Sequence, residues 1–87
     1  MTVQELGKRL SEMYENADDG EKATMVHLFG IRFAKDITNN NFSASEIIRN
    51  TKLSDGSQLY ESYKTEIQKG INLAKYVCEK EKKCTHK

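Results

Sequence analysis

The sequence of 87 residues has no proline, only two cysteines and no glycine-rich stretch. No apolar run approaches the roughly 18 residues that a membrane-spanning helix needs. The first residues, "MTVQELGKRLSEMY", lack the basic and then apolar layout of a signal peptide. We therefore expect a cytoplasmic protein. Because the five glycines are scattered, a glycine-rich phosphate-binding loop is excluded.

The scarcity of cysteine also argues against disulfides and metal sites. A small protein that depends on disulfides usually carries four or more cysteines, so Cys78 and Cys84 are expected to stay reduced. With His86 they could suggest a zinc site. However, five residues separate the two cysteines, zinc knuckles use two to four, and a fourth ligand is missing. We expect no metal and no cofactor.

Residues typical of a catalytic centre are equally sparse. His27 lies between two apolar residues, and no partner at a suitable spacing identifies it as a general base. Asp18 and Asp19 stand in a turn-forming segment and are typical of helix capping. The sequence therefore predicts a protein that is not an enzyme.

What the sequence does contain is one small domain with an uneven charge. The 31% charged and 37% apolar residues are ordinary for a soluble, ordered protein of this length. Residues 1–20 hold five acids against two bases, a balance of −3, whereas residues 64–87 hold seven lysines against three acids, a balance of +4. Such an asymmetry lets one end face an anionic surface, although many solvated helices share it.

Turn-forming segments at 16–20, 38–43 and 53–57 divide the chain into helical stretches. Thr2 and Glu5 form a capping-box pattern that opens the first helix. A second helix is predicted from about Glu21 to Ile37, apolar on more than one side and central to the core. Gly30 in its middle costs about 1 kcal/mol against alanine, which predicts a close helix crossing. The inward face of the first helix is expected to consist of Val3, Leu6, Leu10, Met13, Tyr14 and Ala17.

A short third helix and an amphipathic fourth one follow. Ser43 and Glu46 form a second capping-box pattern, followed by Ile47 and Ile48, and "NTKLSDG" ends the helix. The fourth helix is predicted from near Ser57, and at helical spacing its core side chains would be Leu59, Tyr63 and Ile67.

The end of the fourth helix is left open by the sequence. Gly70 either caps it or lies inside a longer helix. The segment "KYVCE" is the one candidate strand. The fold class is therefore all-α: a bundle of four to five helices over residues 1–78, followed by a frayed basic tail at 79–87.

A short capped helix, a polar turn and an amphipathic helix form the layout of a helix-turn-helix. Leu53 is expected to plug the space between the two helices, and Ser54 to act as a cap or phosphate contact. The inserted "SDGSQLYE" makes the turn longer than a compact one. The second helix would therefore start late, near Tyr60, or be displaced.

Three stretches, "MVHLFGIRFA", "SASEIIRN" and "SYKTEIQKGINLAKYV", resemble a group of small bacterial and phage helix-turn-helix-like domains. These domains occur as free-standing proteins and appended to restriction-type enzymes. The similarity covers roughly residues 3 to 77 and implies DNA association. On this basis we expect a small DNA-binding regulator of transcription, or an accessory of a restriction or phage-related system.

The polar face of the fourth helix is the candidate DNA-binding surface. Lysines supply salt-dependent phosphate contacts, whereas serine, threonine and glutamine can read base edges in the major groove. Glu61 and Glu66 oppose this role because they repel phosphates. Contacts with phosphates are predicted for Lys52, Ser54, Tyr60, Lys64 and Lys69, and contacts with bases for Ser62, Thr65 and Gln68.

Two further expectations concern protein partners. A homodimer is common among helix-turn-helix proteins, and the apolar residues of the first helix are a candidate dimer surface unless the core uses them. The alternative to DNA binding is a protein-interaction module, such as a small phage or mobile-element protein that docks on a host factor.

Overall fold

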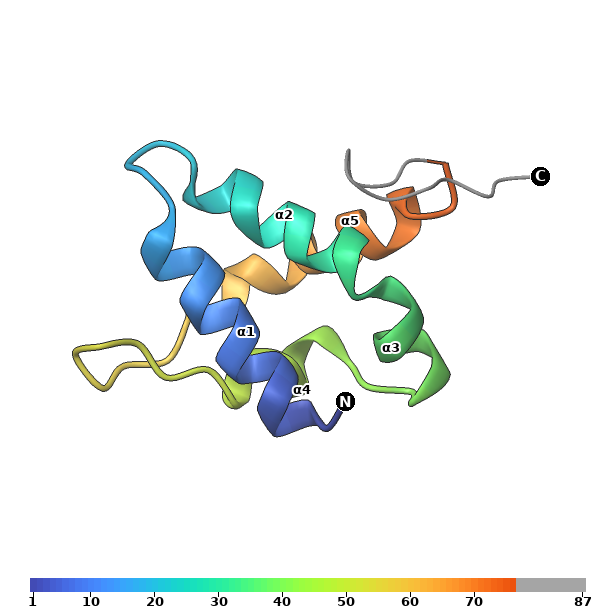
Figure 1. Ribbon diagram of the computed structural model, residues 1–87, viewed down its shortest axis with the longest axis horizontal. Helices are drawn as coiled ribbons and strands as arrows, with labels where there is room; N and C mark the ends of the chain where they lie inside the picture. The colour runs from blue at the N-terminus through green and yellow to red at the C-terminus, as the bar shows by residue number, and fades with distance from the viewer. Residues whose placement is uncertain (77–87) are drawn as a thin grey trace.

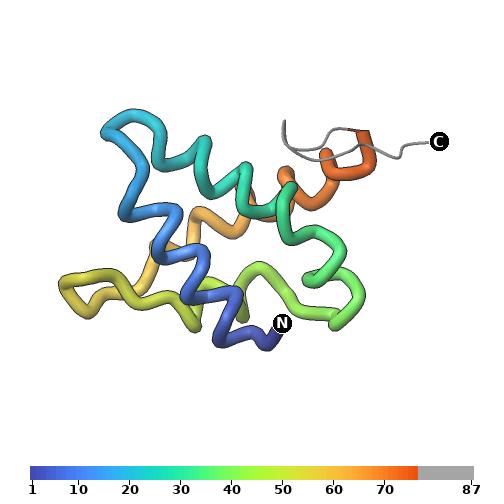
Figure 2. The backbone as a smooth tube through the Cα atoms, in the orientation of Figure 1, coloured from blue at the N-terminus to red at the C-terminus, as the bar shows by residue number. Residues whose placement is uncertain are grey.

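The computed structural model describes residues 1–76, which form an all-α fold (Figures 1 and 2). No strand occurs among these residues, and none of their helices is long and apolar enough to cross a membrane. The candidate strand at 75–79 falls partly outside them, and the predicted tail wholly so. The elements are α1 (Val3–Asn16), α2 (Lys22–Arg32), α3 (Ala34–Asn39), α4 (Ala44–Arg49), the 3₁₀ helix η1 (Glu61–Tyr63) and α5 (Lys64–Leu73).

The helices surround one small apolar core. Helix α2 packs most extensively against α5, α1 packs against α2 and α4, and α4 packs against α5. In Figure 1, α1 crosses in front of α4, and α5 lies behind α2. The core side chains that are buried are Leu6, Leu10, Val26, Phe29, Ile37, Ile47, Ile48, Leu59 and Ile67.

Both predicted capping boxes are confirmed. At the start of α1, Glu5 N donates to Thr2 Oγ1 (3.1 Å) and Thr2 N donates to Glu5 Oε1 (2.8 Å). The bond from the Thr2 backbone lowers the pKa of Glu5. At the start of α4, Ser43 and Glu46 make the same reciprocal pair at 3.1 and 3.0 Å. These bonds satisfy backbone donors that have no partner inside the helix, and so fix where each helix begins.

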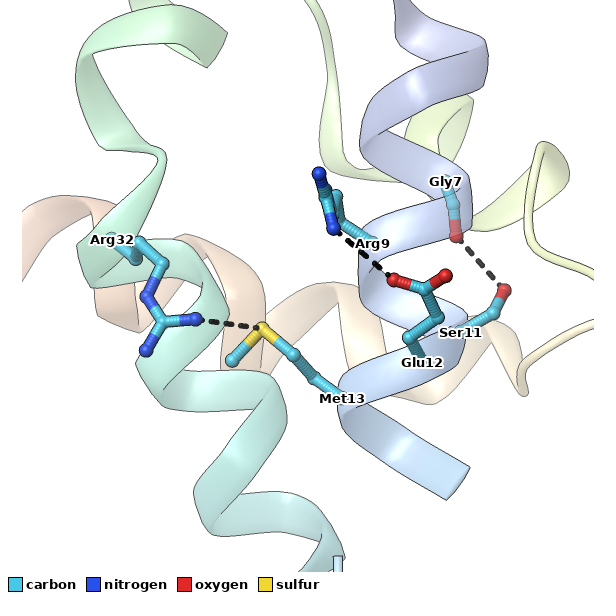
Figure 3. Close-up of polar contacts among 6 residues, drawn as sticks. All are labelled: Gly7, Arg9, Ser11, Glu12, Met13 and Arg32. Atoms are coloured by element: carbon cyan, nitrogen blue, oxygen red, sulfur yellow. Dashed lines mark hydrogen bonds and ion pairs between the residues drawn. The ribbon is translucent and has the colours of Figure 1, made fainter. Parts of the chain in front are cut away.

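The apolar face of α1 is used by the core of its own chain. Leu6 and Leu10 are completely buried, and Val3, Met13 and Tyr14 pack against the core. Helix α1 also meets α2 through Arg32 Nη1, which donates to Met13 Sδ at 3.8 Å (Figure 3). The expectation that this face forms a dimer surface is therefore wrong.

The prediction of one continuous helix over residues 21–37 is also wrong. The helical stretch breaks at Phe33 (φ −107°, ψ 16°), which separates α2 from α3. The break lets α2 follow α5 while α3 turns, so that Ile37, only 2% exposed, still reaches the core. A stretch that is apolar on more than one side serves two directions of packing here.

The close crossing predicted from Gly30 is confirmed, and its partner is Gly70. A Cβ atom on Gly30 would lie 2.4 Å from the carbonyl oxygen of Ile67, and one on Gly70 would lie 2.2 Å from that of His27. Gly70 therefore lies inside α5 rather than capping it. The two glycines let the backbones of α2 and α5 touch.

Residues 50–60 form an irregular segment, here called the strap, between α4 and η1. The prediction that the next helix starts near Ser57 is wrong, and the late start near Tyr60 is confirmed. Leu53 N donates to Ser57 O (2.8 Å), and Asp55 Oδ1 accepts from Ser57 N (2.9 Å). These local bonds compete with helix formation at the predicted start.

Leu59 is buried from the strap and not from a helix face. It is 3% exposed, whereas Leu53, the predicted plug, is only partly buried. Leu53 packs against the core, but Leu59 is the strap residue that belongs to it. Its four-residue spacing to Tyr63 resembles a helical repeat although Leu59 lies outside any helix.

Two buried hydroxyl groups anchor the strap. Ser11 Oγ donates to Gly7 O (2.8 Å, Figure 3) and accepts from Lys52 N (2.9 Å). Thr51 Oγ1 donates to a carbonyl of α4 (2.6 Å) and accepts from Leu59 N (2.9 Å). Each hydroxyl thus links a helix to a backbone N–H of the strap, and satisfies a donor that would otherwise cost about 1–3 kcal/mol when buried.

Candidate nucleic-acid interface

Helix α5 is braced from behind and open in front. Ile67 and Gly70 are buried against the rest of the chain, whereas the polar side chains between them face outward. All eight predicted DNA-binding residues are exposed: Lys52, Ser54, Tyr60, Ser62, Lys64, Thr65, Gln68 and Lys69. The packing required of a recognition helix is therefore present.

The exposed face of α5 carries cations at its two edges. At 100° per residue, Lys64 and Lys69 lie about 140° apart around the helix axis. Thr65 and Gln68 fall within that arc. A helix placed in a groove with this face forward would present hydroxyl and amide groups to the floor and one lysine toward each wall.

The two glutamates of this region differ in their surroundings. The carboxylate of Glu66 lies 3.5 Å from His27 Nδ1 on α2 and 3.9 Å from Lys69 Nζ. Its side chain is 30% exposed, so it opposes an approaching phosphate less than the sequence suggests. Glu61, in η1, is exposed. The second ring nitrogen of His27, Nε2, is buried and has no hydrogen-bond partner within residues 1–76.

Three predicted residues converge on one groove. Its walls are the first residues of α4 and the exposed face of α5, and it is lined by Ser43, Ala44, Ser45, Lys64, Thr65 and Gln68. No binding role was predicted for the residues on the α4 side. The one available signal was the general layout of a helix-turn-helix, in which the start of the bracing helix lies beside the second helix.

The polar face extends one turn further than predicted. Gln68 Nε2 donates to Asn72 Oδ1 at 3.2 Å, and Asn72 is exposed. The four-residue spacing of the two amides was the available signal, because such pairs share one helix face. Together they form a pair of amides able to donate and accept.

The predicted phosphate contacts on the strap lie apart from this groove. Ser54 N donates to Glu15 Oε2 (2.7 Å), and the Ser54 hydroxyl donates to the same oxygen. The bond from the Ser54 hydroxyl, and then the bond from its backbone N–H, lower the pKa of Glu15. A phosphate would have to displace this carboxylate to reach Ser54. Lys52 has an exposed side chain, and Tyr60 is 74% exposed where the strap enters η1.

Metal ligands are not gathered in the described part of the chain. Among residues 1–76, no three side chains of His, Cys, Asp or Glu come together in a way that could hold an ion. Cys78, Cys84 and His86 lie outside these residues, so the expectations about them remain predictions.

Comparison with known proteins gives one match. A family model described as an HTH-like domain matches residues 2–80. No curated protein and no solved structure matches the chain.

Proposed function

The chain belongs to the HTH-like domain family, and on that premise we propose that it binds double-stranded DNA through the exposed face of η1 and α5. The observation that carries the proposal is the two-sided character of α5. Ile67 is completely buried behind it, while Lys64, Thr65 and Gln68 are exposed in front. That division is the one a helix needs to enter a major groove.

The proposed mechanism assigns each side chain by its chemistry. Lys64 and Lys69, at the edges of the face, contact phosphates and supply the salt-dependent part of the affinity. Ser62, Thr65 and Gln68 meet base edges, where hydroxyl and amide groups can both donate and accept. Supporting phosphate contacts on the strap come from Lys52 and Tyr60, and Ser54 would join them on release from the Glu15 carboxylate.

Binding without catalysis suits a small regulator of transcription, or an accessory in a restriction or phage-related system. We propose this range of roles on the size of the domain and the character of α5. We also propose a cytoplasmic location, which is compatible with a DNA ligand.

Reversing the two edge charges should abolish binding. For the double variant Lys64→Glu/Lys69→Glu, the dissociation constant for a duplex should rise at least about 100-fold, because two attractions to phosphate become repulsions. For the unmodified protein, the logarithm of the association constant should fall steeply with the logarithm of the salt concentration, with a slope of about −0.9 per phosphate contact. Fluorescence anisotropy of a labelled duplex at several salt concentrations measures both quantities.

The matched control is Lys8→Glu/Arg9→Glu, which makes the same change in net charge on the exposed face of α1. It should keep most of the affinity. An equal loss in the control would show that net charge alone governs binding. Absence of any duplex binding at about 50 mM salt would contradict the proposal.

The proposal includes a homodimer on DNA, in which two copies of α5 would occupy successive turns of the duplex. The dimer would have to use a surface other than the apolar face of α1, because the core buries that face. Sedimentation of the protein with and without duplex checks this. A mass of 10.0 kDa free, and one copy per duplex when bound, would contradict the dimer.

A protein-docking role is the second candidate, and one surface favours it. An open apolar groove on α2 and α5 is lined by Thr24, His27, Leu28, Ile31 and Leu73. Leu73 is 40% exposed there. A docking protein would show no shift with any duplex at low salt and would capture one polypeptide instead.

A further inference from the structure

A second groove adjoins the candidate DNA-binding surface. It runs between α3 and α5, past the C-terminal end of α5. Its polar lining comes from Lys35, Thr38 and Asn39 on one side and from Gln68, Asn72 and Lys75 on the other. Gln68 lines both this groove and the one between α4 and α5. The two grooves therefore meet along one face of α5.

The electrostatic character of the combined grooves is one-sided. The chain has 13 acidic residues, yet no aspartate or glutamate lines either groove. Three lysines do: Lys64 in the first groove, and Lys35 and Lys75 in the second. Amides and hydroxyls make up the rest of the polar lining. Lysines without a carboxylate among the lining residues make this surface attractive to an anion.

The side chains that line the grooves are suited to a duplex and not to a single strand. Proteins that hold single strands usually offer aromatic side chains on which bases stack. No aromatic residue lines either groove. Lysines interspersed with amides and hydroxyls are instead suited to the sugar–phosphate backbone of a duplex, which is contacted by such groups.

The length of α5 indicates where that backbone would lie. Ten residues of α-helix span about 15 Å, and the major groove of B-DNA is about 12 Å wide. A helix of this length lying along the groove, with Lys64 toward one wall and Lys69 toward the other, follows the phosphate backbones over its whole length. Lys64 stands at the first end, and Lys75, with Lys35 beside it across the second groove, stands just beyond the other.

We infer that the groove between α3 and α5 seats a stretch of the DNA phosphate backbone, with Lys35 and Lys75 as its phosphate contacts. This inference rests on the proposed function, since it assigns further contacts to the same ligand. It makes α3, which lies outside the helix-turn-helix, part of the interface. It also gives the break at Phe33 a role, because the break turns α3 so that Lys35 lines a groove with α5.

The test removes the two charges without reversing them. For Lys35→Gln/Lys75→Gln, the dissociation constant for a duplex of about two turns should rise roughly tenfold. The slope of log K against log salt should fall by about 1.8, which corresponds to two lost phosphate contacts. The matched control, Lys8→Gln/Arg9→Gln, loses the same charge from α1 and should change neither quantity. Far-UV circular dichroism confirms that both variants are folded.

Each outcome separates the inference from the proposed function. If the unmodified protein binds duplex DNA, and Lys64→Glu/Lys69→Glu abolishes binding, but Lys35→Gln/Lys75→Gln behaves like its control, the inference is overturned and the proposed function stands. If the unmodified protein binds no duplex, both fail. If a single strand of the same length binds as tightly as the duplex and is weakened equally by the variant, the groove holds single strands and the inference is overturned.

Discussion

Replacing Gly70 by alanine should lower the free energy of unfolding by about 3 kcal/mol, at the upper end of the usual cost of overpacking. The added methyl group would lie 2.2 Å from the carbonyl oxygen of His27. Because the obstacle is backbone and not a flexible side chain, α2 and α5 must move apart to admit it. Those helices share the largest contact in the fold, so the separation opens the core.

The same substitution elsewhere supplies the control. Gly20→Ala has nothing within 4 Å of the new Cβ, and its positive φ of 88° limits the cost to backbone strain of about 1–2 kcal/mol. Denaturant unfolding followed by circular dichroism measures both variants. Gly30→Ala should cost about as much as Gly70→Ala, and the double variant less than their sum, because one separation relieves both clashes. A Gly70→Ala loss no larger than that of Gly20→Ala would contradict the crossing.

Truncating Phe29 to alanine should cost about 3–5 kcal/mol, the range for a fully buried phenylalanine. Phe29 is completely buried, and its ring lies 5.1 Å from that of Phe33, between centroids. Domains of this size have a total stability of about 4–13 kcal/mol. The melting temperature should fall by more than about 12 °C, or the cooperative transition should disappear.

Tyr60→Ala is the matched control for the loss of an aromatic ring. Its side chain is 74% exposed, so its removal should change stability by no more than about 0.5 kcal/mol. The same variant should weaken duplex binding if Tyr60 contacts phosphate as proposed. Equal destabilisation by Phe29→Ala and Tyr60→Ala would contradict the described core.

The features that were predicted correctly depend on short-range chemistry. A capping box needs only two residues three positions apart, so Thr2 with Glu5 and Ser43 with Glu46 could be read directly. Gly30 was informative for a different reason. A glycine inside an otherwise apolar helix carries a cost that only a close neighbour offsets, although the identity of that neighbour, Gly70, depends on the tertiary fold.

The features that were missed depend on contacts distant in sequence. The strap is fixed by hydroxyl groups, and one of them, on Ser11, lies 41 positions from the N–H that it accepts, that of Lys52. No local pattern announces such a bond. Leu59 fits a helical spacing, yet it is buried from an irregular segment. The spacing of apolar residues shows which side chains are suited to the core, but not the backbone conformation that buries them.

The candidate site divides in the same way. The outward orientation of Lys64, Thr65 and Gln68 followed from the periodicity of a single helix. The second groove did not, because Lys35 and Lys75 line it together only after the chain has broken at Phe33 and α5 has crossed α2.

The crossing of α2 and α5 also has a consequence for biosynthesis. The two helices that share the largest contact are separated by the whole of α3, α4 and the strap. A nascent chain that has emerged only as far as α4 contains Phe29 but lacks Ile67 and Gly70, the glycine of α5 at the crossing with α2. The domain should therefore acquire protection from proteases late, once residues 64–73 have left the ribosome, and in a single step.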